Sequence, residues 1–531
     1  MWEEGDKVGE FFNPDNLGFQ YALNSKIYVD KTMLIENTNS VINTNDRYVC
    51  VSRPRRFGKS ITAEMLVSYY SRGCDSKDMF QDLKISKASD FERHLNKYNV
   101  FHLNMDLFLT KSKNIESMIS TITSTLIKEV KEAYPEFKNA RWRDLEEACT
   151  AIFKETKIPF IFIIDEWDCV LREYQKDKEK HKEYLEFLKL LFKDKKYLAL
   201  AYMTGILPIK KYGKHSALNM FTEISMIEPD EYAEFTGFTE EEVKVLCKKY
   251  NMCFEDIKKW YNGYDLMGIS TYNPRSVVMS LNKHRLGDFW TSTETYEALT
   301  KYIEMNFDGL KDAIALLIAG QKVKVVTNSF TNDMVTFNSK HDILTLLIHL
   351  GYLTYNYDTQ EAWIPNNEIL KQFATTIEDL SWLEVSKALL ISDELLKATL
   401  ACDGDKVAQL IDVAHSDNTS ILKYNDENSL ACVISIAYYS ARRHYDIYRE
   451  LPAGKGYADL VFVPRKNVDM PAMIIELKYD KSADTAIKQI KDRNYSNGLK
   501  DYHGEVLIVG INYNKDDITK KHSCKIEKLT K

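Results

Sequence analysis

The stretch RYVCVSRPRRFGKSITAEML, residues 47–66, constrains the fold more than any other part of the chain. Tyr48–Ser52 is a short β-prone run, and apolar residues recur at helical spacing over Ser60–Tyr70. A turn containing a glycine joins the two segments. The stretch therefore predicts a strand, a loop and a helix, the local architecture with which α/β domains bind phosphate.

Gly58, Lys59 and Ser60 stand at the start of the predicted helix, where free backbone N–H groups can hold an anion. In the pattern G-x-x-x-x-G-K-[ST], the lysine reaches the β- and γ-phosphates and the hydroxyl group binds Mg²⁺. Arg53 stands where that pattern has its first glycine, so a chance GKS with a capping serine is the alternative. The candidate residues of this loop are Arg55, Arg56, Phe57, Gly58, Lys59, Ser60 and Ile61.

A second motif, PFIFIIDEWD, occupies residues 159–168. Phe160–Ile164 is apolar throughout, as in a buried parallel strand, and it ends in Asp165 and Glu166. Ligands of open α/β sheets bind at the carboxyl ends of the strands. We therefore expect Asp165 to hold Mg²⁺ and Glu166 to polarise the attacking water. An acidic helix cap after a core strand is the alternative, but the two motifs together are more specific than either alone.

Two further residues are candidates for contacts with a nucleotide. Thr204 ends the predicted strand Tyr197–Gly205, where it would sense a γ-phosphate; a turn residue before glycine is the alternative. Arg275 follows Pro274, which suits the first turn of a helix. That helix belongs to a predicted lid after the helix Glu240–Tyr250, and Arg275 either reaches the nucleotide from the lid or lies on the surface.

The last part of the chain has two acids and a lysine on two β-prone runs, Ala458–Val463 and Ala472–Tyr479, that predict a hairpin. Asp459 starts the first strand, and Glu476 and Lys478 share one face of the second. Two carboxylates converging there form a hard-oxygen site for Mg²⁺ or Mn²⁺. Lys478 can hold the attacking water or neutralise the phosphate. A solvated E-x-K pair is the alternative, which the apolar residues before it disfavour.

The net charge of −7 hides an asymmetry along the chain. Residues 441–531 contain 18 Lys and Arg against 13 Asp and Glu, whereas the remainder is acidic. A polyanionic partner, DNA above all, is therefore expected at the C-terminal end; a solvated lysine-rich tail is the alternative. The candidate phosphate contacts are Arg442, Arg443, Lys455, Lys488, Lys491 and Arg493.

Composition argues against several other classes of protein. The chain is 44% hydrophobic and 28% charged, and its apolar runs fall far short of the ~18 residues of a membrane span. Its acidic beginning lacks the apolar core of a signal peptide. Nine scattered cysteines without a C-x-x-C pair argue for reduced thiols and against a disulfide framework or a zinc site. We expect a cytoplasmic protein without a membrane partner.

The middle of the chain predicts a winged-helix-like outline. An amphipathic helix in DILTLLIHLG, residues 342–351, precedes the two strand candidates YLTYNYD and EAWIPN and a further helix. The first helix is poor in Arg and Lys, which favours an interaction or packing role over base readout. Glu378–Ala414 is helical and acidic, and we interpret it as a spacer.

Six motifs carry a resemblance to the predicted AAA-ATPase-like proteins. In order along residues 10–285 they are NSKIYVDKTMLI, RPRRFGKS, FIIDEWD, MTGILPI, WYNGY and YNPRSV. That family commonly has arginines before F-G-K-S, so the resemblance implies that Arg53 is no departure from its pattern. It also implies that Tyr28 and Asp30 lie near the adenine, although a strand followed by a helix cap explains these residues equally well.

Residues 420–531 resemble the PD-(D/E)xK nuclease superfamily through Asp459 and the E-x-K pattern. Ala458 stands where a proline usually precedes the first acid. The resemblance implies a further metal ligand from a preceding helix, which Glu427 fits, although an acid in a first helical turn also compensates the helix dipole. It further implies Gln489 as a contact to nucleic acid, for which Tyr495 is a weaker candidate, and Glu450 is a weaker candidate neighbour of the metal.

The sequence thus predicts an α/β chain with five parts. These are an AAA-like P-loop ATPase domain (1–225), a helical lid (226–295), a winged-helix-like domain (296–378), a helical spacer (379–418) and a restriction-endonuclease-like α/β domain (419–531). The expected function is binding and hydrolysis of ATP, with Mg²⁺-dependent cutting of DNA and with ATP controlling domain arrangement or assembly of a homo-oligomer. One alternative is a nucleotide-switch ATPase whose nuclease fold binds nucleic acid without cutting it. Another is a transcription factor that uses the middle domain.

Overall fold

The computed structural model describes residues 9–209, 218–290, 296–305, 307, 309–331, 337–379, 388–414, 427–453, 456–465, 468–493, 499, 502–516 and 521–529. The chain divides into two compact units, each described here by itself. The first comprises residues 1–295 and 324–369, and the second comprises 296–323 and 370–531.

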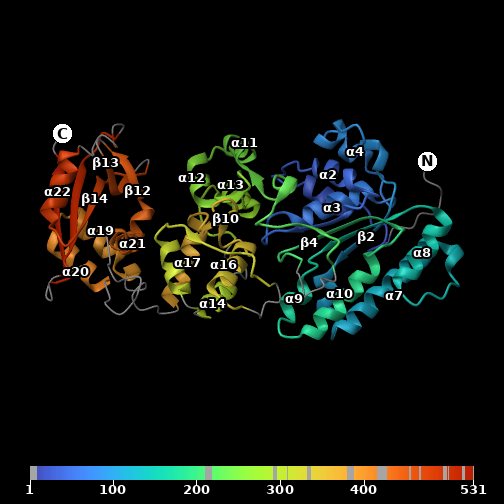
Figure 1. The fold of residues 1–531 in the computed structure, drawn as a ribbon. Coiled ribbons are helices and arrows are strands. Elements are labelled where there is room, and N and C mark those ends of the chain that lie inside the picture. Colours follow the sequence, from blue (N-terminus) through green and yellow to red (C-terminus); the bar gives the residue numbers. More distant parts are fainter. Residues whose placement is uncertain are drawn as a thin grey trace. The chain divides into compact units, whose positions relative to one another are not determined.

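A five-stranded parallel sheet forms the centre of the first unit (Figure 1). Its spatial order is β2 (Asn99–Asn104), β3 (Phe160–Asp165), β4 (Leu198–Gly205), β1 (Tyr48–Ser52) and β5 (Thr222–Ile224). The strand predicted at Tyr48–Ser52 is confirmed, and the one predicted from Phe160 extends to Asp165. Every residue of β1, β3 and β4 is buried, as expected for strands covered on both faces.

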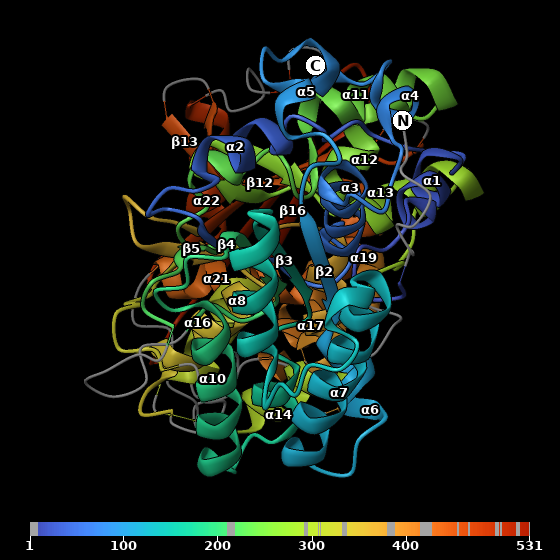
Figure 2. The ribbon, with the colours of Figure 1, turned by 90° about the vertical axis from the view of Figure 1, so that its right-hand side faces the viewer.

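Helices cover both faces of this sheet, because alternate residues of each strand point to opposite sides. Val49 and Val51 of β1 pack on one side, and Tyr48 and Cys50 on the other. The first side is covered by α1 (Leu17–Leu23), α2 (Leu34–Val41), α3 (Lys59–Tyr70), α4 (Lys77–Phe80) and α5 (Phe91–His94). The second is covered by α6 (Met105–Thr110), α7 (Ile115–Ala133), α8 (Leu145–Thr156), α9 (Cys169–Glu173) and α10 (Lys178–Phe192), of which α7 and α10 are prominent in Figure 2.

A lid follows the sheet and begins as the sequence predicts. Its helix α11 (Glu240–Tyr250) starts with a capping box between Thr239 and Glu242. The helix α13 (Pro274–Lys283) starts at Pro274, and the Asn273 side chain accepts a hydrogen bond from the N–H of Ser276. Between these helices lie α12 (Phe254–Tyr261), β7 (Tyr264–Leu266) and β8 (Ile269–Tyr272), and β8 also pairs with β6 (Phe238–Thr239).

The predicted winged-helix outline is present in the middle of the chain. Helix α16 (Lys340–His349) precedes the antiparallel strands β10 (Thr354–Asn356) and β11 (Glu361–Trp363), which form a three-stranded sheet with β9 (Val323–Lys324). Helix α17 (Asn367–Asp379) follows. Every residue from Asp342 to His349 is buried, so only Lys340 and His341 of α16 are partly exposed, which disfavours this helix as a reader of DNA bases.

A mixed five-stranded sheet forms the centre of the second unit. Its order is β12 (Tyr445–Ala453), β13 (Gly456–Pro464), β14 (Ala472–Tyr479), β15 (Val506–Tyr513) and β16 (His522–Leu529). Only β14 and β15 run parallel among the neighbouring pairs described. The helices of this unit are α14 (Tyr296–Glu304), α15 (Leu310–Ile318), α19 (Ser392–Leu400), α20 (Gly404–Ala414), α21 (Glu427–Ala437) and α22 (Ala483–Asp492).

The two faces of β14 enter different cores. Ile475 and Leu477 pack with residues of α19, α20 and α21, whereas Ile474 packs with Ile487 and Ile490 of α22. The buried positions of α22 are Ala483, Ala486, Ile487 and Ile490. One predicted boundary is wrong: β13 begins at Gly456 because it pairs with β12 there, so Asp459 lies inside the strand and not at its start.

Short 3-10 helices complete the fold at Lys84–Lys87, Pro135–Phe137, Asp230–Tyr232 and Tyr439–Arg443. All nine cysteines fall within the described ranges and are free thiols. In those same ranges, no helix is long and apolar enough to cross a membrane.

Candidate functional site

The candidate phosphate loop connects β1 to α3 with two residues in the left-handed region. Gly58 has a φ of +93° directly before α3, where a residue without a side chain is favoured, and Arg56 has a φ of +68°. The Nζ of Lys59 donates to the carbonyl oxygens of Arg53 and Pro54, at 3.0 and 2.9 Å. Lys59, the candidate residue for binding phosphate, is thus hydrogen-bonded to its own loop in this structure.

Arg53 supports the loop from inside the protein. Its side chain is fully buried, and its Nη1 donates to the carbonyl oxygens of Ser52, Ile224 and Ser225 at 3.0, 3.2 and 2.8 Å. Burial lowers the pKa of this guanidinium to about 10. The residue at the first glycine position therefore ties β1 to the end of β5 and takes no place among the residues that face the loop's ligand.

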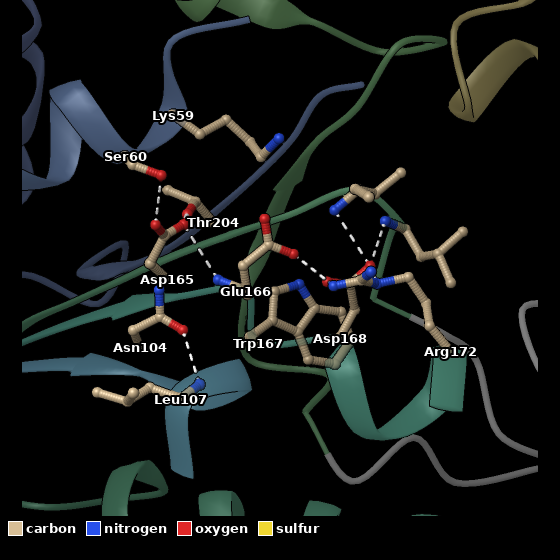
Figure 3. Close-up of polar contacts among 12 residues, drawn as sticks. Lys59, Ser60, Asn104, Leu107, Asp165, Glu166, Trp167, Asp168, Arg172 and Thr204 are labelled. Atoms are coloured by element: carbon tan, nitrogen blue, oxygen red, sulfur yellow. Dashed lines mark hydrogen bonds and ion pairs between the residues drawn. The ribbon is translucent and has the colours of Figure 1, made fainter. Parts of the chain in front are cut away.

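Asp165 collects three donors at the end of β3 (Figure 3). Ser60 Oγ donates to its Oδ2 at 2.6 Å, and the backbone N–H of Glu166 donates to its Oδ1 at 3.1 Å. Thr204 Oγ1 donates to the same Oδ1 from the end of β4. The parallel register of β1, β3 and β4 brings the two sequence motifs together as predicted.

Glu166 is held by a positive partner that the sequence did not reveal. Its φ is +54°, a strained conformation for a residue with a side chain, and its carboxylate pairs with Arg172 of α9. Burial and the neighbouring Asp168 raise the pKa of Glu166. Arg172 Nε also lies 3.3 Å from Asp168, which accepts the backbone N–H groups of Ile206 and Leu207 at 3.1 and 2.8 Å (Figure 3).

The loop before α3 and the end of β3 line one cavity of about 860 Å³. Its wall includes the predicted residues Arg55, Arg56, Phe57, Gly58, Lys59, Ser60, Ile61, Asp165, Glu166 and Arg275. Thr204 is fully buried, is not among the lining residues and reaches the site only through Asp165. Asn104 and Asp106 also line the cavity and were not predicted. The signal for Asn104 is its position at the carboxyl end of β2, beside Asp165.

The two residues implied near the adenine separate in the structure. Tyr28 lines the cavity together with Ile27, Val29, Phe238 and Val278. Asp30 accepts instead the N–H and hydroxyl of Thr32, at 2.9 and 2.6 Å, and the N–H of Lys84, at 2.8 Å. Asp30 therefore closes a turn before α2, and residues 28–31 form no strand, so the predicted strand at IYVDKT is wrong.

The second candidate site lies on the α22 face of β14. Asp459 is opposite Glu476 by the register of β13 and β14, and its Oδ2 accepts the N–H of Leu477 at 2.7 Å. Described pairing of the two strands ends at Leu460 and Ile475, and Glu450 on β12 interrupts its own ladder with a φ of +48°. Such an irregularity in a ladder often re-aims side chains at a site.

Glu476 and Lys478 are almost fully buried, with 2% and 4% of their surface exposed. Lys478 Nζ lies 2.9 Å from Glu476 Oε1, which also accepts from the Gln489 side chain. Burial and repulsion by Asp459 raise the pKa of Glu476 to about 7. This burial disfavours the interpretation of the pair as solvated.

Glu476 Oε2 is buried with no hydrogen-bond partner in the described part of the chain. A buried carboxylate oxygen next to a second acid fits a divalent cation, which would satisfy both charges. Within the ranges given above, no cluster of three or more His, Cys, Asp or Glu is arranged to hold a metal. The side chain of Glu427 lies outside the described residues, although α21 begins at this residue as predicted.

The residues predicted to contact the phosphates of nucleic acid differ in how accessible their side chains are. Lys488 is exposed on α22, whereas Lys455 and Tyr495 lie outside the described residues. Lys491 pairs with Glu527 at 2.5 Å, and Arg443 lies 3.6 Å from Asp393. The Nε of Arg442 is buried, and burial lowers the pKa of this guanidinium. An open path of phosphate contacts through Arg442 is therefore not supported.

Comparison with known proteins identifies two regions of the chain. Residues 20–213 match the family described as Predicted AAA-ATPase, and residues 425–523 match the PD-(D/E)XK nuclease superfamily. An "Uncharacterized protein in vnfD 5'region" of Azotobacter chroococcum mcd 1 is 22% identical over 92% of this chain and 93% of its own length.

The solved structure of the Aeropyrum pernix ORC2 protein (ADPNP-ADP complexes) matches 70% of this chain and 99% of its own, at 12% identity and a TM-score of 0.30. A TM-score at this level assigns no common fold. The two regional matches agree with the parallel sheet of the first unit and with the mixed sheet of the second. The chain therefore contains a region at residues 20–213 that matches the Predicted AAA-ATPase family and a C-terminal domain at residues 425–523 that matches the PD-(D/E)XK nuclease superfamily.

Proposed function

We propose that the first unit binds and hydrolyses ATP in the cavity at the carboxyl end of its sheet. One observation carries this proposal: Lys59 and Ser60 at the start of α3 share that cavity with Asp165 and Glu166 from the end of β3. A lysine, a hydroxyl and a pair of acids are the groups that phosphoryl transfer requires. The volume of about 860 Å³ is in the range of ligand sites in proteins.

Each side chain has a role in this proposal. Lys59 exchanges its two carbonyl partners in the loop for phosphate oxygens, and Ser60 and Asp165 hold Mg²⁺. Arg275 adds positive charge from α13 of the lid. Glu166 orients the attacking water, and its release from Arg172 controls when it can do so. The apolar wall around Tyr28 receives the base.

We further propose that the second unit is a metal-dependent nuclease that acts on DNA. Asp459 and Glu476 would hold Mg²⁺ or Mn²⁺, which neutralises charge on the phosphate and activates water when bound. Lys478 donates from the same strand face as Glu476 and stabilises negative charge that develops on the phosphate. Gln489 orients Glu476, and Lys488 is available to the phosphate backbone. In this proposal ATP binding controls domain arrangement or assembly of copies.

A nucleotide switch without rapid turnover is the second candidate function. The ion pair between Glu166 and Arg172 favours it, because this carboxylate is hydrogen-bonded to a guanidinium in place of an attacking water. In that case the second unit binds nucleic acid and does not cut it.

Two measurements on the same protein test these proposals. Binding of a fluorescent ATP analogue should be lost in Lys59→Ala and retained in Lys87→Ala, an exposed lysine outside the cavity. Supercoiled plasmid with Mg²⁺ should be nicked by the wild type and by Asp469→Asn, an exposed acid of the second unit, but not by Asp459→Asn. Absence of nucleotide binding rejects the first proposal, and absence of nicking with Mg²⁺ or Mn²⁺ favours the switch.

A further inference from the structure

Residues far away in the sequence form hydrogen bonds and ring contacts with the candidate phosphate loop. Trp290 Nε1 donates to the carbonyl oxygen of Arg55 at 3.0 Å, and the N–H of Gly237 donates to that of Phe57 at 2.8 Å. The Phe57 and Tyr264 rings pack in a T-shaped arrangement with their centroids 5.2 Å apart. Two residues of the loop, Arg55 and Phe57, are thus held by the segment from Gly237 to Trp290.

Gly351, between α16 and β10, packs against the same loop. A side chain there would lie 2.7 Å from Pro54 Cγ and 3.3 Å from the Trp290 ring, and the φ of Gly351 is +85°. Tyr264 donates from its hydroxyl group to the Gly351 carbonyl oxygen at 2.9 Å. Glycine is therefore required by contact as well as by conformation.

Trp290 is itself fixed by a buried acid. Only 1% of its surface is exposed, and its backbone N–H donates to Glu368 Oε1 at 2.7 Å, beside that of Phe289 at 2.6 Å. Glu368 Oε2 accepts from the Ser276 hydroxyl at 2.7 Å, one residue after Arg275 in the cavity wall. A continuous set of bonds therefore runs from the loop through Trp290 to α17 and back to the lid.

Because the peptide bond is planar, the hydrogen bonds to the Arg55 and Phe57 carbonyls also orient the neighbouring N–H groups. The carbonyl of Arg55 and the N–H of Arg56 belong to one trans peptide group and point in opposite directions. Because Trp290 holds the Arg55 carbonyl, the N–H of Arg56 points away from the indole. Likewise, because Gly237 holds the Phe57 carbonyl, the N–H of Gly58 points away from Gly237. Arg56 and Gly58 both line the cavity. Their N–H groups are the donors that a phosphate at this loop would use.

We propose that Trp290 is a positioning residue of the phosphate site: its indole N–H sets the Arg55–Arg56 peptide for phosphate and links the state of the cavity to residues 349–368. This inference rests on the proposed nucleotide site. Contacts from Trp290, Gly237 and Gly351 thus fix the conformation of the loop. They add to the hydrogen bonds that Arg53, within the loop, donates to β1 and β5.

The full chain with Trp290→Phe tests the inference, because phenylalanine keeps an aromatic ring and removes the N–H donor together with part of the buried indole, a loss of volume that the control shares. The matched control is Trp260→Phe on α12, whose indole N–H has no hydrogen-bond partner among the described residues. Affinity for a fluorescent ADP analogue should fall about tenfold in Trp290→Phe, because a buried carbonyl loses its donor, and should not change in Trp260→Phe.

Hydrogen exchange supplies a readout that a general loss of stability would not reproduce. At saturating ADP, amides of residues 349–363 should become more protected in the wild type, and this change should disappear in Trp290→Phe although the nucleotide is bound. If Trp290→Phe does not fold, Tyr264→Phe removes the bond to Gly351 and should also abolish the change.

The outcomes separate the inference from the function on which it rests. A wild type that binds no nucleotide overturns both. A wild type that binds ADP, with equal affinity and equal exchange changes in Trp290→Phe and Trp260→Phe, overturns only the role of Trp290.

Discussion

Glu368 is the buried acid whose neutral replacement gives the sharpest test of how the first unit is held together. Its side chain is 1% exposed and accepts from the N–H groups of Phe289 and Trp290 and from the Ser276 hydroxyl. Burial raises its pKa from 4.5 to about 7, against the opposing effect of these hydrogen bonds. In Glu368→Gln, the amide oxygen keeps both backbone donors and the amide nitrogen donates to Ser276.

The raised pKa fixes the sign of the pH dependence. The folded protein binds the proton of Glu368 more tightly than the unfolded chain, so stability is greatest below about pH 4.5 and falls as the pH rises through about 7. A shift from 4.5 to about 7 corresponds to about 3 kcal/mol in total. Between pH 5 and 8 the loss from this one group is about 2.5 kcal/mol, because part of the effect lies below pH 5.

Urea denaturation of the wild type and of Glu368→Gln at pH 5 to 8 measures this difference. The free energy of unfolding of the wild type should fall relative to that of the variant by about 2.5 kcal/mol across this range. Glu186→Gln, an exposed acid of α10, is the control and should run parallel to the wild type. Parallel curves for wild type and Glu368→Gln would refute the reasoning, since they would mean that Glu368 titrates alike in both states.

Three further outcomes are expected. Arg53→Met should lower the free energy of unfolding by about 2 kcal/mol, because three carbonyl oxygens lose their buried donor; an unchanged urea midpoint would contradict this. Arg172→Gln removes a positive partner of Glu166, so the pKa of Glu166 should rise further and the pH–rate profile for ATP hydrolysis should move to higher pH; an unmoved profile would rule the pair out as a control of Glu166. Mn²⁺ should bind the second unit more tightly as the pH rises through about 7, where Glu476 ionises, and about tenfold more weakly in Gln489→Ala; titration by electron paramagnetic resonance checks both, and a pH-independent affinity would exclude Glu476 as a ligand.

Local patterns predicted the elements that carry the sites. The strand Tyr48–Ser52, the helix Glu240–Tyr250 and the start of α13 at Pro274 follow from short-range signals, namely an apolar run, a capping box and a proline. The meeting of Ser60 with Asp165 also followed, because parallel strands of one sheet bring their carboxyl ends together.

What the sequence did not reveal depends on contacts between distant segments. Arg53 is indistinguishable in the sequence from the exposed Arg56, and only the carbonyls of Ile224 and Ser225 make it a buried support. Thr204 ends its strand as predicted, but its hydroxyl is used by Asp165. Asp459 falls inside its strand because pairing with β12, and not local propensity, sets where β13 begins.

The contact between Gly351 and Pro54 has a consequence for how the first unit can be divided. The family match ends at residue 213, well before the residues that cover the loop. A protein shortened to that match would expose Pro54 and Phe57 to water and would lose the donors from Trp290 and Gly237. We therefore expect a fragment of residues 1–369 to bind nucleotide more tightly than residues 20–213, and expression of the two fragments side by side would test this.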